Sequence, residues 1–242
     1  MNEISALQEI IDNSDNIVFF GGAGVSTESG IPDFRSENGV FKSLEKYGHS
    51  PEYLVSHSYY LENTEEFFNY YKENLVFKDA KPNPAHLKLA ELEKAGKLKA
   101  VITQNIDGLH QKAESRNVLE LHGSIHRNYC EFCKREYDLD FILESEGVPI
   151  CECGGIVKPD VVLYEEPLNN DVLSASINYI ANADTLIIGG TSLVVYPAAG
   201  LINYFNDSKL VLINKSETPY DNLASLVINE AIGETLEQIK IK

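Results

Sequence analysis

Short apolar runs recur along the chain, and most of them end in glycine or a small polar residue. The runs lie at residues 16–21, 99–103, 118–121, 184–190 and 209–214, with a weaker one at 226–229. Continuous apolar runs of this length are typical of strands that are buried on both faces of a parallel sheet.

Segments with a helical pattern separate several of these runs. They cover residues 83–95, 169–181 and 197–206. Alternation of buried strands with helices predicts an α/β fold. We therefore expect a doubly wound, mostly parallel, Rossmann-like sheet.

Two stretches interrupt the alternation. Residues 36–78 are helical in pattern and rich in aromatic side chains, and residues 124–160 carry all the cysteines, several charges and few apolar runs. We expect these two insertions to form a smaller domain together. The sheet domain would then comprise residues 1–35, 79–123 and 161–242.

Composition and charge restrict the kinds of molecule that the chain could bind. The chain has 242 residues and a formal net charge of −17, from 20 basic and 37 acidic residues. This balance argues against direct nucleic-acid binding, which needs clustered Lys and Arg side chains. It is compatible with a basic protein partner, although solubility alone explains it as well.

We expect no membrane span, because no apolar run is long enough. We also expect a cytoplasmic protein, because the N-terminal residues lack a basic signal-peptide start.

The four cysteines are arranged in two pairs, Cys130 with Cys133 and Cys151 with Cys153. This spacing is close to that of a structural zinc site, in which four thiolates form a closed tetrahedron. Two disulfides are the alternative, and a reducing compartment favours zinc over them. We expect Zn²⁺ to hold structure here, with the chemistry elsewhere.

The loop after the first apolar run carries candidate cofactor contacts. Gly22 and Gly24 would let backbone amides approach a pyrophosphate, although the third glycine of the dinucleotide fingerprint is missing. Asp33, Phe34 and Arg35 then offer a hydrogen-bond acceptor, a stacking face and a phosphate clamp. An ordinary connecting loop is the alternative.

Polar side chains also follow the next two predicted strands. Gln104, Asn105 and Asp107 come directly after residues 99–103, where ligands of open α/β sheets bind. His122 follows the next strand and precedes a glycine. That placement favours a general base over a structural histidine. We interpret His110 and His126, which lack such placement, as surface or packing residues.

Two further strand ends complete the set. Gly190, Thr191 and Ser192 form a turn that suits phosphate or ribose hydroxyls, and Asn214 with Lys215 is placed to receive an adenosine half. Each of these could be a plain loop start. Their combination at one edge of a sheet is what favours a dinucleotide site.

Taken together, the motifs resemble those of the sirtuins, the NAD-dependent protein-lysine deacylases, over nearly the whole chain. The matching segments, in the family's order, are Gly22-Ala23-Gly24-Val25-Ser26, Gly30-Ile31-Pro32-Asp33-Phe34-Arg35, Thr103-Gln104-Asn105-Ile106-Asp107-Gly108-Leu109-His110, His122-Gly123, the four cysteines, Lys158-Pro159-Asp160-Val161-Val162 and Gly190-Thr191-Ser192-Leu193.

The resemblance implies a role for each matching position. It implies that His122 is the catalytic base, that Asn105 is a second catalytic residue and that Asp107 helps to hold the nicotinamide end. It implies that Val161, Val162 and Leu163 pair with the substrate peptide as a strand. The NAD-binding residues expected from the strand ends and the resemblance together are Gly22, Ala23, Gly24, Thr27, Asp33, Phe34, Arg35, Gln104, Asn105, Ile106, Asp107, His122, Gly190, Thr191, Ser192, Asn214, Lys215 and Ile232.

The implied reaction is NAD-dependent deacetylation of acyl-lysine proteins or peptides, which releases nicotinamide and O-acetyl-ADP-ribose. In it the acyl oxygen takes the place of nicotinamide on the ribose, and His122 then removes a proton from a ribose hydroxyl. Two other functions stay open at this point: ADP-ribosyl transfer from the same cofactor, and a non-catalytic zinc protein that senses NAD.

The chain departs from the family's usual pattern at Tyr164-Glu165-Glu166, where Phe-Gly-Glu is common, and in its shortened second cysteine pair. Loss of that glycine is expected to alter the peptide groove. Sirtuins that prefer acidic acyl groups resemble one another in a Tyr-x-x-Arg pair on a helix beside the acyl pocket. The corresponding stretch here is identified as residues 67–71, which has no arginine.

Overall fold

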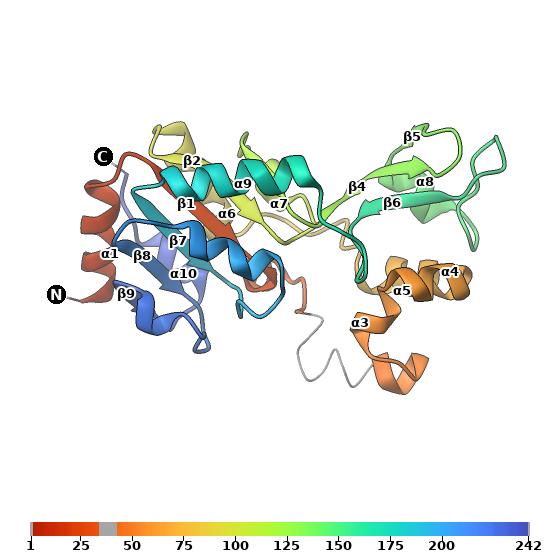
Figure 1. Cartoon of the computed structure of the whole chain (residues 1–242), viewed down its shortest axis with the longest axis horizontal. Coiled ribbons are helices and arrows are strands. Elements are labelled where there is room, and N and C mark those ends of the chain that lie inside the picture. Colours follow the sequence, from red (N-terminus) through yellow and green to blue (C-terminus); the bar gives the residue numbers. More distant parts are fainter. Residues whose placement is uncertain (1, 34–42, 242) are drawn as a thin grey trace.

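The computed structural model describes residues 2–33 and 43–241. Its main sheet has six parallel strands in the order β3-β2-β1-β7-β8-β9 (Figure 1). The strands are β1 (Ile17–Gly21), β2 (Leu98–Thr103), β3 (Val118–Glu120), β7 (Thr185–Gly189), β8 (Lys209–Ile213) and β9 (Leu226–Ile228). The doubly wound parallel sheet is therefore confirmed, and its strands coincide with the apolar runs of the sequence.

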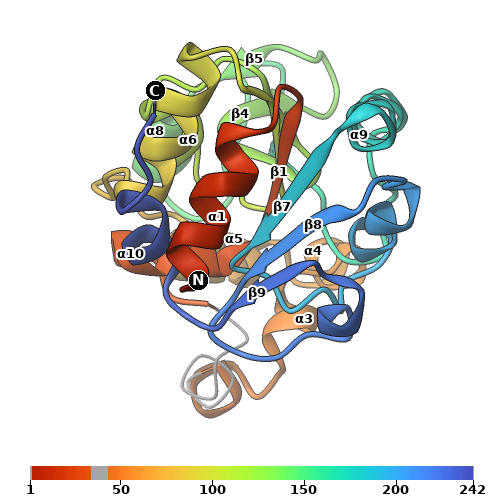
Figure 2. The ribbon, with the colours of Figure 1, turned by 90° about the vertical axis from the view of Figure 1, so that its left-hand side faces the viewer.

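Helices cover both faces of this sheet (Figure 2). On one face, α1 (Glu3–Asp12), α6 (Pro84–Lys94) and α10 (Ile232–Glu237) pack against Ile17 and Phe19 of β1. On the other face, α9 (Asn170–Asn182) and a 3-10 helix (Ala198–Tyr204) pack against Val18 and Phe20. Adjacent residues of β1 thus serve two separate cores, which explains why the run has no polar position.

Two helical segments differ from the sequence expectation. Helix α1 was not expected; Asn2 caps it by accepting a hydrogen bond from Ser5 N at 2.8 Å, and Leu7 and Ile11 form its buried stripe. The segment expected as a helix at 197–206 is a 3-10 helix, and Gly200 within it lowers α-helix propensity.

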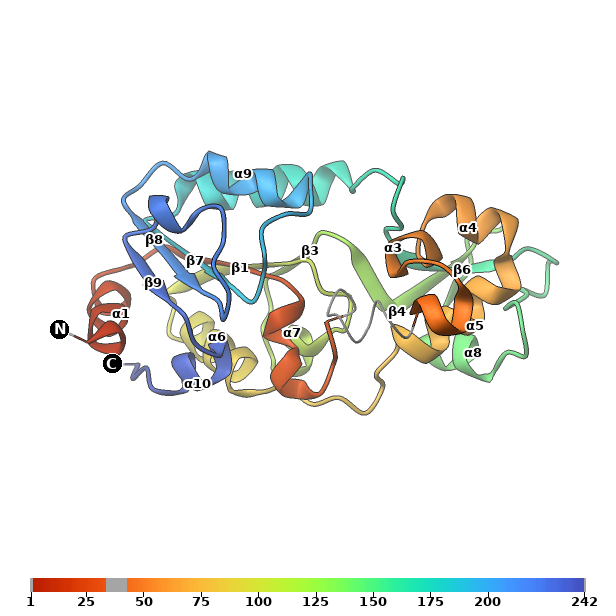
Figure 3. The ribbon, with the colours of Figure 1, turned by 90° about the horizontal axis from the view of Figure 1, so that it is seen from below.

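The smaller lobe contains a three-stranded antiparallel sheet of β4 (Gly123–Cys130), β5 (Glu136–Tyr137) and β6 (Val157–Val161), with helix α8 (Leu139–Glu144). The helices α3 (Pro51–Leu54), α4 (His57–Glu62) and α5 (Thr64–Asn74) lie beside this sheet (Figure 3). Aromatic side chains of α4 and α5 share one hydrophobic core with Ile125, Ile142 and Val157. The two insertions therefore bury apolar surface against each other.

The junction between the lobes is fixed by Gly123, the first residue of β4. Its φ of +77° is in the left-handed region, and a Cβ atom would lie 1.8 Å from the carbonyl oxygen of Asp160. Only glycine satisfies both constraints. The preceding residue, His122, consequently lies between β3 of the main sheet and β4 of the small lobe.

Within residues 2–33 and 43–241, no helix has both the length and the apolar composition that a membrane span requires.

Candidate active site

The turns after β1, β2 and β7 are joined by backbone hydrogen bonds. Gly24 N donates to Gly190 O at 2.8 Å, Gly22 N donates to Gly189 O at 3.3 Å, and Gln104 N donates to Gly21 O at 3.0 Å. These bonds lie at the carboxyl edge of the sheet, the edge at which open α/β sheets bind ligands. The structure thus brings together three of the turns that the sequence singled out.

Glycine is required where the first of these turns meets the third. A Cβ atom on Gly24 would lie 2.7 Å from Gly190 Cα, and one on Gly22 would lie 2.8 Å from Thr191 Cβ. Gly190 itself has a φ of +59°. Such close backbone approach is the property that phosphate-binding glycine turns use.

A buried hydroxyl connects two of the polar residues that follow β2. Ser26 Oγ donates to Asp107 Oδ2 at 2.6 Å and accepts from Asn105 Nδ2 at 3.0 Å. Ser26 is only 1% exposed. Asp107 Oδ1 also accepts from Leu109 N at 2.9 Å. Both side chains are therefore held in one orientation before any ligand arrives.

His122 is oriented by the backbone of the same loop. Its Nδ1 lies 3.0 Å from the carbonyl oxygen of Gln104, which can only accept a hydrogen bond. The ring proton is therefore on Nδ1, and Nε2 is the basic nitrogen. Gln104 is fixed in turn, because its Nε2 donates to Thr191 Oγ1 at 3.1 Å.

The other cofactor candidates lie around this edge with varied exposure. Thr27 Oγ1 donates to Gly24 O at 2.9 Å, and the buried Ile232 packs on Gly189. Asn214 Nδ2 donates to Ser216 O at 2.7 Å beyond β8, where Lys215 is exposed. Ala23, Asp33, Ile106 and Ser192 are also in the described residues, whereas Phe34 and Arg35 lie outside them.

The four cysteine sulfurs meet at the tip of the small lobe, all within 4.8 Å of one another. Cys130 Sγ lies 3.4 Å from Cys153 Sγ, and Cys133 Sγ lies 3.6 Å from Cys151 Sγ, so no disulfide is formed. A Zn²⁺ tetrahedron with bonds of about 2.3 Å needs sulfurs roughly 3.8 Å apart. The donor set therefore fits a structural zinc ion, despite the shortened second pair.

Comparison with known proteins agrees with this geometry. The Sir2 family matches residues 22–197, more than half of the chain. The chain belongs to the Sir2 family.

Several relatives are similar over their whole length. A protein of Clostridium perfringens named NAD-dependent protein deacetylase is 64% identical over 98% of this chain and 98% of its own. One of Clostridium acetobutylicum with the same name is 59% identical over 99% and 98%. A solved Sir2 variant with a deacetylated p53 peptide and 3'-O-acetyl ADP-ribose has a TM-score of 0.88 and 39% identity, covering 98% of this chain and 97% of its own. A Sir2 complex with p53 peptide and NAD⁺ has a TM-score of 0.85 and 38% identity, with 98% and 97% covered.

In this Sir2 family member, His126 and His110 have different environments. His126 is exposed, and its Nε2 donates to Asp107 O at 3.1 Å, so it supports the loop after β2. His110 is 1% exposed and packs between Phe19 and His86, with ring centroids 6.2 Å and 4.7 Å away. Both fit their interpretation as surface or packing residues.

The segment expected to pair with substrate already uses part of its backbone. Val162 N donates to His122 O at 3.0 Å, and Leu163 N donates to Glu166 Oε2 at 2.9 Å. Leu163 O accepts from Glu166 N at 3.0 Å. Both backbone groups of Leu163 therefore have one internal partner each, although its carbonyl oxygen can accept a second hydrogen bond. No internal bond to Val162 O occurs in the described residues. Pairing through all of residues 161–163 remains a prediction.

The aromatic stretch at residues 67–71 lies on helix α5 with its aromatic side chains buried. Its four aromatic side chains are at most 2% exposed and form the core of the small lobe. In this Sir2 family member they share that core with Val157 of the small sheet and with Leu163. The acyl preference implied by the absence of an arginine stays a prediction.

Sequence reasoning missed Ser26 as a functional candidate, although it was part of a quoted motif. The signal was weak, since a serine in a glycine-rich turn is common. Its partners Asn105 and Asp107 lie about 80 positions away in sequence, and only the folded sheet brings the three together.

Proposed function

We propose that the chain is an NAD-dependent protein deacetylase that acts on acetyl-lysine side chains. The observation that carries the proposal is the fixed constellation of His122, Asn105 and Asp107 at the carboxyl edge of the sheet, in a member of the Sir2 family. Close relatives bear this name, and similar solved structures hold deacetylated peptide with O-acetyl ADP-ribose.

The glycine turns after β1 and β7 would receive the pyrophosphate, and the ends of β7 and β8 with Ile232 would receive the adenosine half. NAD, when bound, supplies an activated ribose carbon whose bond to nicotinamide breaks during the reaction. Asp107 and Asn105 are both held by Ser26 and would hold the nicotinamide and its ribose. Their fixed orientation removes the cost of ordering them at the moment of reaction.

His122 serves as general base through Nε2, since Nδ1 donates to Gln104 O. It would accept the proton of a ribose hydroxyl, so that this oxygen could attack the carbon of the acyl group. Proton transfer of this kind contributes about a hundred- to ten-thousand-fold in rate. Zinc at the four cysteines has no open coordination position in this scheme and holds the small lobe in shape.

Turnover of an acetyl-lysine peptide tests the proposal. Deacetylation should require NAD and stop when NAD is left out. ADP-ribosyl transfer is the rival outcome, and labelled NAD separates it, because the label would then appear on protein. Absence of NAD-dependent deacetylation on several unrelated acetylated peptides would overturn the proposal.

We also propose a cytoplasmic location. Unpaired, metal-binding thiols are retained in reducing compartments, where disulfides are rare. Cell fractionation with antibody detection tests this, and recovery outside the cytoplasmic fraction would contradict it.

A further inference from the structure

One residue of the substrate-facing turn has an unusual backbone conformation. Glu165 follows β6 and has a φ of +76°. A residue with a side chain is disfavoured in this region, because its Cβ atom crowds the backbone carbonyl. Something in the surrounding structure must therefore hold Glu165 there.

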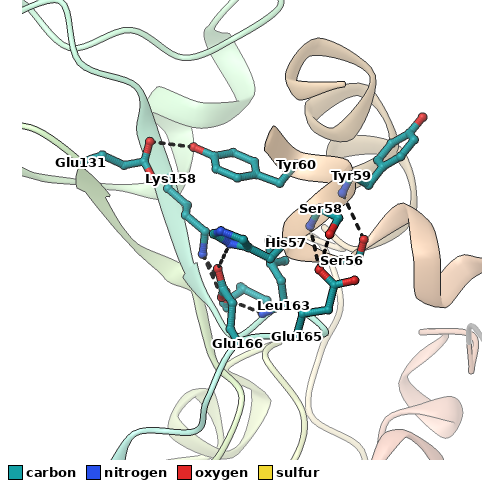
Figure 4. A network of polar contacts seen from close by, with 11 residues as sticks. Ser56, His57, Ser58, Tyr59, Tyr60, Glu131, Lys158, Leu163, Glu165 and Glu166 are labelled. Carbon is teal, nitrogen blue, oxygen red and sulfur yellow. Dashed lines mark hydrogen bonds and ion pairs between the residues drawn. The ribbon is translucent and has the colours of Figure 1, made fainter. Parts of the chain in front are cut away.

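The side chain of Glu165 supplies part of that hold. Its Oε2 accepts hydrogen bonds from Ser58 N at 2.9 Å and from Ser58 Oγ at 2.7 Å, at the start of α4 (Figure 4). The preceding residue pairs with the same region, since Tyr164 N donates to Val55 O and His57 N donates to Tyr164 O, each at 3.0 Å. The turn is thereby fastened to the helical insertion.

The neighbouring Glu166 closes the turn from the other side. Its Oε1 accepts from His57 Nδ1 at 2.9 Å, and its Oε2 accepts from Leu163 N at 2.9 Å and pairs with Lys158 Nζ at 3.2 Å (Figure 4). The carboxylate thus ties β6 to α4 through one side chain.

These bonds determine which backbone groups are open to a peptide. In the described residues, neither Val162 O nor the N–H and C=O of Glu165 has an internal hydrogen-bond partner. An added strand needs free backbone groups at such an edge. The conformation of Glu165 decides where two of the three open groups point.

We propose that Glu165 is a positioning residue for the acyl-lysine substrate. Its carboxylate, bonded to Ser58, holds the left-handed backbone that presents the open groups of Val162 and Glu165 to the peptide. We call this pair of bonds the Glu165 latch. The inference deepens the proposed deacetylase function and rests on it.

Steady-state kinetics of three variants test the latch. Glu165→Ala removes the latch, while alanine still disfavours the left-handed backbone conformation. The turn that binds the peptide should then be less populated, so the KM for an acetyl-lysine peptide should rise about tenfold. Glu165→Gly should stay within about threefold of the parent, because glycine adopts the left-handed region freely. Glu165→Gln, whose amide oxygen can still accept from Ser58, should lie between the two. The kcat and the KM for NAD should be unchanged in all three.

The order of the variants separates this role from others. Equal KM values for Glu165→Ala and the parent would overturn the latch. A Gly variant as impaired as the Ala variant would also overturn it, because loss of the carboxylate's charge would then be the cause. Glu146→Ala is the matched control, as it removes an exposed carboxylate of the small lobe that makes no hydrogen bond in the described residues.

Amide hydrogen exchange tests the latch without any turnover. Glu165→Ala should speed exchange about tenfold or more at residues 163–166 and at the start of α4, and the control should not. Unchanged exchange would contradict the latch. If the parent protein fails to deacetylate while exchange responds as expected, the proposed function fails and the latch stands as a feature of the turn.

Discussion

At the scale of single residues, His122 is the side chain whose loss should affect turnover most. His122→Ala should lower kcat about a hundred- to ten-thousand-fold, because the base that activates the ribose hydroxyl is gone. NAD affinity should change little, since the glycine turns that we propose receive the cofactor are untouched. Turnover assays and calorimetric NAD titration measure the two effects.

His49→Ala is a suitable control for that experiment, because His49 is an exposed histidine that packs on Tyr53 of the small lobe. Unaltered turnover in His122→Ala would remove this histidine from the mechanism.

Asp107 should govern the response to nicotinamide. Its two carboxylate oxygens accept from Ser26 Oγ and Leu109 N, and an amide in its place would turn an N–H group toward one of these donors. Asp107→Asn should therefore weaken nicotinamide inhibition about tenfold or more, given the cost of an unmatched buried polar pair. The inhibition constant is the measurement, and Ser26→Ala should shift it in the same direction. A constant that stays the same in both variants would count against this assignment.

Candidate active-site residues could be predicted from sequence where a polar side chain directly follows an apolar run. Gln104, Asn105, Asp107 and His122 are proposed on this basis, and the structure places them at one edge of the main sheet. Ser26 was not singled out, and the replaced glycine at Glu165 indicated only an altered peptide groove. The hydrogen-bond partners of these two residues, Asp107 and Ser58 respectively, lie far away in sequence.

At the scale of elements, helix α6 and helix α7 (Leu109–Lys112) bury two histidines against each other. Burial lowers the pKa of His86 from 6.5 to about 4 and that of His110 from 6.5 to about 3. The neighbouring His86 also lowers the pKa of His110 by charge repulsion. No hydrogen-bond partner is found in the described residues for either ring nitrogen of His110 or for Nε2 of His86. Both rings are therefore neutral in the folded protein near pH 7.

This pair predicts a loss of stability in acid. The unfolded chain binds protons at these histidines below about pH 6.5, whereas the folded protein does so only near pH 4 and pH 3. The contribution of these histidines to the free energy of unfolding should be fully present above pH 6.5. It should be lost as the pH falls toward 4, by roughly 3 kcal/mol for each histidine. Denaturant unfolding at several pH values measures this. His110→Leu should flatten the curve between pH 6.5 and 4, and a slope equal to the parent's would contradict the assignment.

The four cysteines, which lie at the end of β4 and in the segment before β6, should bind one metal ion. Cys130→Ser or Cys151→Ser should release zinc and lower the thermal stability of the small lobe, because structural zinc binding is coupled to folding. Metal analysis and calorimetry are the measurements. Glu152→Gln, a change at the exposed carboxylate between two of the cysteines, should retain the metal. Metal-free protein with full stability would show another role for the thiols.

The strands of the main sheet could be predicted from sequence, whereas helix α1 could not, for a physical reason. A strand buried on both faces has no polar position, as in Ile17–Gly21, so a short run is enough to find it. Helix α1 buries only Leu7 and Ile11, and this stripe is short among acidic residues. It also packs against β9, and a pattern within one segment does not contain such tertiary contacts.

At the scale of the whole molecule, the small lobe is assembled from two distant insertions. Tyr60 of α4 donates from its Oη to Glu131 Oε2 at 2.9 Å, and the two insertions share one core. This contact supports our proposal that residues 36–78 and 124–160 form one small domain. The sequence indicated both insertions, but the packing of Phe67 and Tyr71 into that core depends on the tertiary contact and could not be inferred from the aromatic pattern.

The central claim is that this Sir2 family member transfers an acetyl group from lysine to the ribose of NAD. Mass spectrometry of one reaction mixture, with an acetyl-lysine peptide and NAD, tests it most directly. We expect deacetylated peptide, nicotinamide and O-acetyl-ADP-ribose in equal amounts, and deacetylated peptide about a hundredfold or more slower with His122→Ala. Nicotinamide accompanied by free ADP-ribose or ADP-ribosylated protein, with the peptide still acetylated, would contradict the claim.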